Sequence, residues 1–203
     1  MATPESLSDP GPEDMELNQR LTYEPAQKFF HWAMAIVVLS AIALGLWSSF
    51  LVPGDPLRKA LLDLHKSFGF TAAALILPRI ICRLMSRASV GQPEPNRLFR
   101  LAAHGTHFGL YALMILMPVT GYLFSAAGGY SLPWFGLFHW PRLVDESKAM
   151  SLAGKWLHDK GAWLIYAAVS AHILAVIWHS VFRRDDVLWR MLPDWRSDDE
   201  TPD

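Results

Sequence analysis

Histidine is the residue type with the most chemistry to offer in this sequence, and it occurs eight times. The copies are His31, His65, His104, His107, His139, His158, His172 and His179, and seven of them lie in or beside long apolar stretches. Ionisable side chains at membrane depth are costly and usually face the interior of a helix bundle. An imidazole there can bind a metal or haem iron, relay a proton, or hydrogen-bond to a neighbouring helix.

The spacing of the histidines favours one of these roles. His158 and His172 are separated by 14 residues, which in a helix is about 40° short of four full turns and about 21 Å in depth. One helix face therefore carries two histidines at two levels. His31 opens the first apolar stretch and His65 opens the second, which runs in the opposite direction. We expect His31 at the depth of His172, and His65 at the depth of His158.

Two histidine pairs at two depths are the arrangement that two haems with paired axial histidines require. A porphyrin supplies four nitrogens and two imidazoles complete the coordination, so no further protein ligand is needed. Zinc would need four protein ligands, or three and a water, and only Asp159 adjoins these histidines. No Cys-x-x-Cys-His motif occurs, so the haems are expected to be non-covalent and b-type. For any histidine taken alone, the alternative is an interfacial or helix-linking role.

Three further residues share the expected haem-facing sides. Gly45 lies 14 residues after His31, and Gly69 lies one turn after His65, so each could leave a gap for a porphyrin. The alternative is close helix packing through small residues. Arg79 lies 14 residues after His65, where it could pair with a haem propionate or extend toward the lipid headgroups.

The elements that must position these residues are membrane-spanning helices. Of the 203 residues, 52% are apolar and 18% are charged, with 18 Lys+Arg and 19 Asp+Glu. None of the charged residues falls within 29–52, 67–78, 101–141 or 161–182. Uncharged apolar runs of about 18 residues or more indicate membrane spans. We predict an all-α, up-and-down transmembrane four-helix bundle with two b-type haems.

One membrane domain, residues 25–195, is expected between a disordered acidic tail at 1–24 and a second acidic tail at 196–203. The expected spans are about 27–52, 63–86, 98–126 and 157–182. The connection between the last two spans is rich in Trp, Phe and Pro, and we expect it to lie on the membrane surface.

The charges also set the orientation and exclude some classes of function. Eleven Lys and Arg residues lie on the side of the termini and seven on the other side, which favours cytoplasmic termini. A net charge of −1 without basic blocks argues against nucleic-acid binding. Cys82 is the one cysteine, so the chain has neither an internal disulfide nor a thiolate metal cluster.

The residues that open the spans resemble the bacterial cytochrome b561 family, small four-helix di-haem membrane proteins that include superoxide oxidase. The matching segments are Phe30-His31-Trp32, Leu64-His65-Lys66-Ser67-Phe68-Gly69, Ala103-His104-Gly105-Thr106-His107 and Trp156-Leu157-His158, followed by His172 and His179. The resemblance covers about residues 21–195. It implies that His31 and His172 ligate one haem iron, and that His65 and His158 ligate the other.

The resemblance also implies electron transfer between a periplasmic one-electron donor and ubiquinone in the bacterial inner membrane, with superoxide oxidised to oxygen. Four lysines on the expected periplasmic side could attract this anion, or they are ordinary solvated charges; they are Lys59, Lys66, Lys155 and Lys160. His104 and His179 could border the quinone headgroup, or contact a haem propionate instead. The alternative function is a non-catalytic electron relay, or a membrane anchor for a partner dehydrogenase or hydrogenase.

Overall fold

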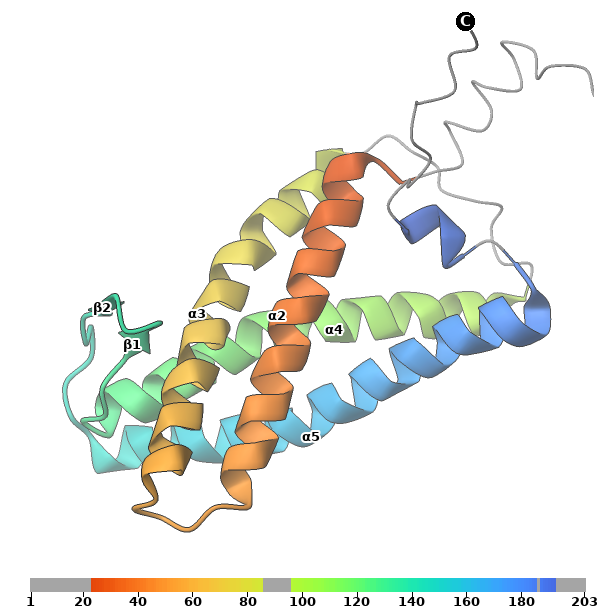
Figure 1. Cartoon of the computed structure of the whole chain (residues 1–203). Coiled ribbons are helices and arrows are strands. Elements are labelled where there is room, and N and C mark those ends of the chain that lie inside the picture. The colour runs from red at the N-terminus through yellow and green to blue at the C-terminus, as the bar shows by residue number, and fades with distance from the viewer. Residues whose placement is uncertain (1–22, 86–95, 186, 193–203) are drawn as a thin grey trace, which may run out of the picture.

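The computed structural model describes residues 23–85, 96–185 and 187–192, and four long helices make up most of this part (Figure 1). They are α2 (Pro25–Ser49), α3 (Pro56–Met85), α4 (Arg97–Ala127) and α5 (Lys148–Trp178). The expected N-terminal tail falls outside the described residues except for its last two positions. The C-terminal tail and most of the connection between the second and third spans fall outside them as well.

The four helices form two hairpins, in which α2 packs along α3 and α4 packs along α5. The two hairpins cross each other steeply (Figure 1). We call the end that holds the connections 50–55 and 128–147 the loop side. The opposite end, where α2 begins and α5 ends, is the tail side. An apolar core between the hairpins is formed by Met34, Ala72, Ile76 and Met114.

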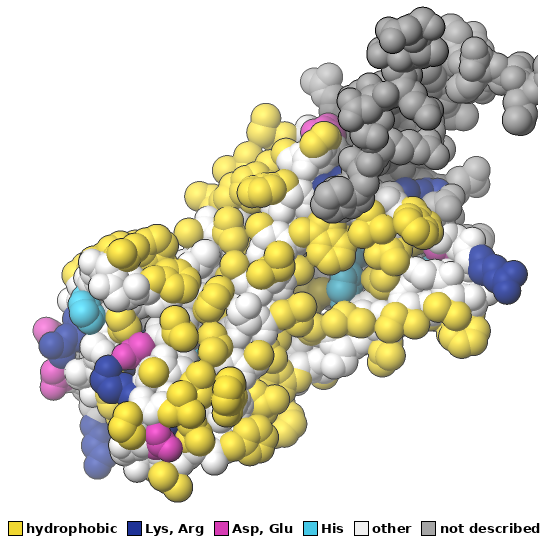
Figure 2. Space-filling model, in the orientation of Figure 1, with side chains coloured by type: hydrophobic (Ala, Val, Ile, Leu, Met, Phe, Trp, Pro, Cys, Tyr) yellow, Lys and Arg dark blue, Asp and Glu magenta, His cyan; other side chains and the backbone are white. Residues whose placement is uncertain are grey.

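All four helices are long and apolar enough to cross a membrane. Large apolar side chains are exposed along their length, including Ile36, Leu77, Ile115 and Leu164. Figure 2 shows this apolar surface over the middle of the molecule, with charged side chains gathered toward the ends. The prediction of an all-α transmembrane four-helix bundle is confirmed.

Two helices begin earlier than the expected spans. The second span was expected near Asp63, but α3 begins at Pro56, where the Asp55 carboxylate accepts a hydrogen bond from the Leu57 backbone N–H at 2.8 Å. The fourth was expected near Leu157, but α5 begins at Lys148, and the hydroxyl of Ser147 caps it. Such caps satisfy the free N–H groups of a first turn, so a helix can extend past its apolar segment into a charged region.

The connection between α4 and α5 is an ordered structure that packs on α3. Its two short strands, β1 (Pro133–Trp134) and β2 (Phe138–His139), pair antiparallel. The indole of Trp134 donates to the hydroxyl of Thr71 at 3.2 Å, and the ring of Phe135 packs on that of Phe68. The connection therefore forms a cap on the loop side of α3.

At the tail side, α5 continues as one turn of π-helix, His179–Arg183, and the chain then reverses at Arg184 in the left-handed region (φ 52°). The following 3-10 turn, Trp189–Met191, returns to the beginning of α2. There the indole of Trp32 donates to the carbonyl oxygen of Met191 at 2.8 Å.

Candidate functional site

The loop-side pair of histidines joins the two hairpins. The rings of His65, on α3, and His158, on α5, have centroids 5.9 Å apart. Both side chains are partly buried. The pair was expected from depth alone, and the structure brings these two rings together.

The hydrogen bonds of this pair determine which ring nitrogen is free. His65 Nδ1 lies 2.8 Å from the carbonyl oxygen of Ala41, and His158 Nδ1 lies 3.1 Å from that of Met117. A carbonyl oxygen only accepts, so in both rings Nδ1 is the donor and Nε2 keeps its lone pair. Histidines that bind metals usually have this arrangement, in which one ring N–H is held by a carbonyl and the other nitrogen coordinates.

A cavity of about 1180 Å³ lies between the hairpins at this level. Its lining includes both loop-side histidines and four glycines, Gly45, Gly69, Gly121 and Gly128. An added Cβ at Gly69 would meet nothing within 4 Å, in line with the expected gap there. At Gly45 the neighbouring space holds the His65 ring, 3.0 Å from where a Cβ would stand.

The tail-side histidines form a group of three. The ring centroid of His172, on α5, lies 6.3 Å from that of His31, on α2, and 5.8 Å from that of His107, on α4. Axial ligands occupy opposite faces of a porphyrin, and a porphyrin between the hairpins needs one ligand from each. His31 and His172 meet this condition, whereas His107 and His172 belong to the same hairpin.

Arg79, on α3, reaches His31 of the tail-side pair. Its Nη2 donates to Nδ1 of His31 at 3.0 Å, and its guanidinium lies over the ring of Tyr111 with 5.6 Å to the centroid. The Nε of Arg79 is buried without a hydrogen-bond partner among the described residues. A carboxylate is the group that would satisfy it, because arginine and carboxylate form charge-assisted pairs.

These residues fit haem. A metal–imidazole bond is about 2 Å long, so two imidazoles on opposite sides of one metal have centroids roughly 6 Å apart. The centroid separations of 5.9 Å and 6.3 Å agree with this value. The free Nε2 atoms of the loop-side pair, the cavity between the hairpins and the unpaired guanidinium Nε of Arg79 each suit one part of the haem group.

The two residues expected near a quinone, His104 and His179, each have one local hydrogen-bond partner. His104 is exposed on α4, and its Nδ1 bonds the carbonyl oxygen of Arg100 in its own helix at 2.7 Å. His179 opens the π-turn and pairs with the carboxylate of Asp185 at 2.6 Å. Both lie toward the tail side, on α4 and at the end of α5 respectively.

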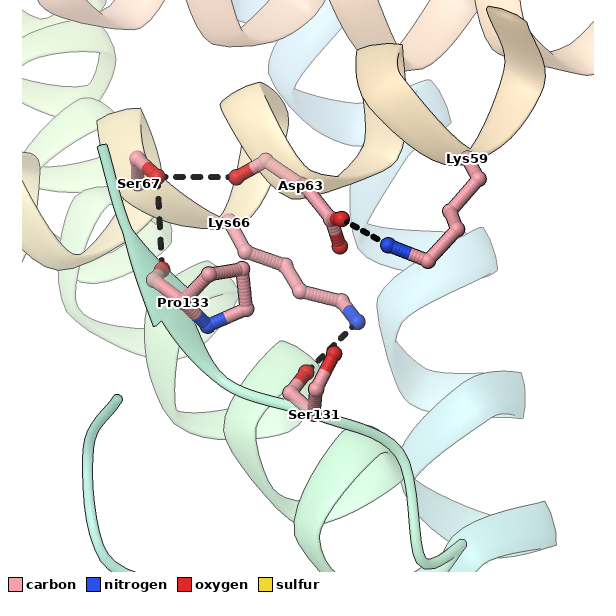
Figure 3. Close-up of polar contacts among 6 residues, drawn as sticks. All are labelled: Lys59, Asp63, Lys66, Ser67, Ser131 and Pro133. Atoms are coloured by element: carbon pink, nitrogen blue, oxygen red, sulfur yellow. Dashed lines mark hydrogen bonds and ion pairs between the residues drawn. The ribbon is translucent and has the colours of Figure 1, made fainter. Parts of the chain in front are cut away.

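The four lysines differ in their partners. Lys59 pairs with Asp63 at 2.6 Å, and Lys155 pairs with Asp159 at 2.5 Å. Lys66 donates to the carbonyl oxygen of Ser131 at 2.9 Å and has no carboxylate partner among the described residues (Figure 3). Lys160 is exposed on α5. Lys66 and Lys155 line the cavity that holds the loop-side histidines.

Sequence reasoning did not identify Gly121 or the contact of His107 with His172, although the sequence contains a signal for both. His107 and Gly121 are 14 residues apart on α4, the separation of His31 and Gly45 on α2. The second hairpin therefore repeats the His-to-Gly spacing of the first.

Comparison with known proteins gives consistent matches along the chain. A family model described as prokaryotic cytochrome b561 matches residues 22–194. Cytochrome b561 homolog 2 of Escherichia coli (strain K12) is 32% identical over 169 residues, 83% of this chain and 90% of the relative. A Yersinia pestis protein named probable superoxide oxidase CybB is 27% identical over 177 residues, 86% of this chain and 97% of the relative. Cytochrome b561 homolog 1 of Escherichia coli (strain K12) is 24% identical over 172 residues, 84% and 97% of the two chains.

Proposed function

Since the chain belongs to the prokaryotic cytochrome b561 family, we propose that it is a superoxide:ubiquinone oxidoreductase with two b-type haems. The family consists of multi-pass membrane proteins of the inner membrane that transfer electrons, and b-type haem is its implied cofactor. The number of haems, their ligands, the donor and the acceptor belong to the proposal.

The observation that carries the proposal is the presence of two histidine pairs, each joining the two hairpins, at opposite ends of the bundle. His65 and His158 would hold one haem on the loop side, and His31 and His172 would hold the other on the tail side. When bound, haem supplies one-electron redox chemistry that no side chain of this protein provides. Two such sites one above the other give an electron a path across the bilayer.

The side chains around these pairs have separate tasks. Arg79 would bind a haem propionate through its buried guanidinium. Gly69 leaves room beside His65, and most of the cavity wall is apolar. The excess of Lys and Arg on the side of the termini favours cytoplasmic termini, and the loop side would then face the periplasm.

The proposed reaction takes place at the two ends of the molecule. Two superoxide anions each lose one electron and become dioxygen, and ubiquinone takes up both electrons and two protons to become ubiquinol. On the loop side, Lys59, Lys66, Lys155 and Lys160 would attract the anion. On the tail side, His104 and His179 would border the quinone and relay protons to it. The relative named probable superoxide oxidase supports this reaction.

The test uses the purified full chain in detergent with a soluble ubiquinone analogue and a steady source of superoxide. We expect quinone reduction faster than superoxide dismutates, together with low-spin haem absorption at two haems per chain. Haem without accelerated quinone reduction would contradict the oxidase reaction and favour an electron relay or anchor for a partner dehydrogenase or hydrogenase. A chain without haem would contradict the whole proposal.

A further inference from the structure

The two hairpins hold their loop-side histidines in the same way. His65 lies against Gly45 of α2, and its Nδ1 bonds the carbonyl oxygen of Ala41, four residues before that glycine. His158 lies against Gly121 of α4, and its Nδ1 bonds the carbonyl oxygen of Met117, again four residues earlier. A repeated contact in two unrelated stretches of sequence indicates a shared requirement.

The geometry of a helix explains why the fourth residue must be a glycine. The carbonyl oxygen of one residue points toward the residue four positions later, whose N–H it normally accepts. A ring from another helix can approach that oxygen more closely from the side where the later residue has no side chain in the way. A Cβ at Gly45 would stand 3.0 Å from both Nδ1 and Cε1 of His65. At Gly121 it would stand 3.2 Å from Nδ1 and 3.0 Å from Cε1 of His158.

We propose that Gly45 and Gly121 are positioning residues for the loop-side haem ligands, an inference that rests on the proposed haem site. Each glycine leaves room for one imidazole to donate its Nδ1–H to a helix carbonyl oxygen. This hydrogen bond directs Nε2 of the same ring into the cavity between the hairpins. A hydrogen bond of this kind fixes the tautomer and makes the imidazole a stronger ligand. The carbonyl contact and the neighbouring glycine are the same for His65 and His158, so backbone atoms would hold both ligands of one iron.

The Nδ1 atom of His158 has one further contact, with Thr120. Its hydroxyl is fully buried and lies 3.2 Å from Nδ1 of His158 while donating to the carbonyl oxygen of Leu116 at 2.9 Å. The hydroxyl oxygen therefore shares the Nδ1 hydrogen with the carbonyl of Met117. Thr120 provides a way to alter the contacts of His158 Nδ1 without adding a clash.

Other glycines in the same helices have no such neighbour. An added Cβ at Gly109, on α4, would meet nothing within 4 Å. Alanine is the better helix former, so replacing a glycine that only occupies a helix position stabilises the helix. Opposite effects of one substitution at Gly109 and Gly121 would separate ligand positioning from helix packing.

The experiment compares Gly45→Ala, Gly121→Ala and the control Gly109→Ala in the full haem-containing chain. The readouts are the haem-to-protein ratio and the low-spin haem signals in electron paramagnetic resonance. We expect Gly45→Ala and Gly121→Ala to shift or remove the same one of the two signals and to leave the other in place. The retained tail-side signal shows that the bundle is folded. Gly109→Ala is expected to keep the loop-side signal of the wild type.

Thr120→Val gives a second test that does not depend on a clash. It removes one acceptor from His158 Nδ1, so we expect full haem content with a changed midpoint potential for the loop-side haem only. The inference is overturned if the glycine variants keep both signals and the full ratio, or if Thr120→Val leaves that potential unchanged. Absence of haem in the wild-type chain would instead reject the proposed function.

Discussion

Arg79 donates from Nη2 to Nδ1 of His31 across 3.0 Å. Arginine has donors only, so His31 Nδ1 carries no hydrogen in this arrangement, and in a neutral ring Nε2 does. Nε2 can bind iron only after that hydrogen has moved. A carboxylate that binds the guanidinium would free Nδ1 to take the hydrogen, and the unpaired Arg79 Nε offers it a place. In the proposed haem site, Arg79 would therefore link the binding of a propionate to the tautomer that allows His31 to coordinate iron.

Replacing Arg79 by glutamine is expected to weaken or abolish binding of the tail-side haem. The variant loses the charge that would hold a propionate, and the loop-side pair is left intact. We expect the haem-to-protein ratio to fall from two toward one, with the loop-side low-spin signal retained. Arg83→Gln, one turn later and exposed, is the matched control and is expected to keep both haems. Full haem content in Arg79→Gln would contradict the propionate role.

Alanine substitution of the four ligands tests how they pair. His65→Ala and His158→Ala are expected to lose one and the same low-spin signal, because the two rings face each other across the hairpins. His31→Ala and His172→Ala are expected to lose the other signal. Spectra of the four single variants are sufficient to decide this. If His65→Ala and His172→Ala emptied the same site, the pairing by depth would be wrong.

His31 and His107 both lie close to His172, and a substitution of His107 tests which of the two ligates the tail-side haem. His107 is as close to His172 as His31 is, but it lies in the same hairpin as His172. We expect His107→Ala to keep both haems and to change only the potential or spectrum of the tail-side haem. Loss of that haem in His107→Ala, with retention in His31→Ala, would show that the third histidine is the ligand.

The pairing of the histidines could be predicted from the sequence because it depends only on helix periodicity and on the alternating direction of the spans. A separation of 14 residues places His158 and His172 on one face at two depths in any straight helix. Which histidines meet across the hairpins then follows from depth. The uncharged stretches predicted four helices for the same reason, since a bilayer accepts few other structures.

The contacts that the loop-side histidines make with the neighbouring helices could not be predicted in this way. The contact of His158 with Gly121 depends on how closely α5 approaches α4, a distance that periodicity does not set. The early starts of α3 and α5 depend on capping by Asp55 and Ser147, which lie outside the apolar stretches. The fold of the 128–147 connection depends on side-chain hydrogen bonds to α3, which composition does not reveal.

Ser67 is the main polar link between α3 and this connection, and its loss has a calculable cost. Its buried hydroxyl accepts from the backbone N–H of Phe135 at 2.9 Å. It also lies 2.8 Å from the carbonyl oxygen of Asp63 and 3.3 Å from that of Pro133 (Figure 3). Ser67→Ala removes the acceptor for the backbone N–H of Phe135, and the loss of one such hydrogen bond costs about 0.5–1.5 kcal/mol.

We expect this cost to appear as a lower midpoint of thermal unfolding in detergent and as faster proteolysis within 128–147. Ser131→Ala is the matched control, because the exposed Ser131 accepts from Lys66 through its backbone carbonyl, which the substitution keeps. Equal stability of the Ser67→Ala and wild-type chains would show that this hydroxyl does not anchor the connection.

The proposed attraction of superoxide can be tested by removing the charge of Lys66, at the cavity, or of Lys59, in an exposed ion pair. Lys59 shares its charge with Asp63 at 2.6 Å, whereas Lys66 lies at the cavity without a carboxylate partner among the described side chains. A unit charge acting across about 10 Å of water contributes about 0.4 kcal/mol, a factor of about 2 in rate.

Lys66→Gln is therefore expected to lower the rate of haem reduction by superoxide about twofold at low ionic strength. The effect should shrink as salt rises, because screening shortens the reach of the charge. Lys59→Gln should change the rate less, because the Lys59 side chain is 76% exposed and lies outside the cavity lining, so water and salt screen its charge more than that of Lys66. Stopped-flow reduction at several salt concentrations measures both variants. A twofold loss in Lys66→Gln that persisted at high salt would indicate altered packing against Ser131 in place of a lost charge.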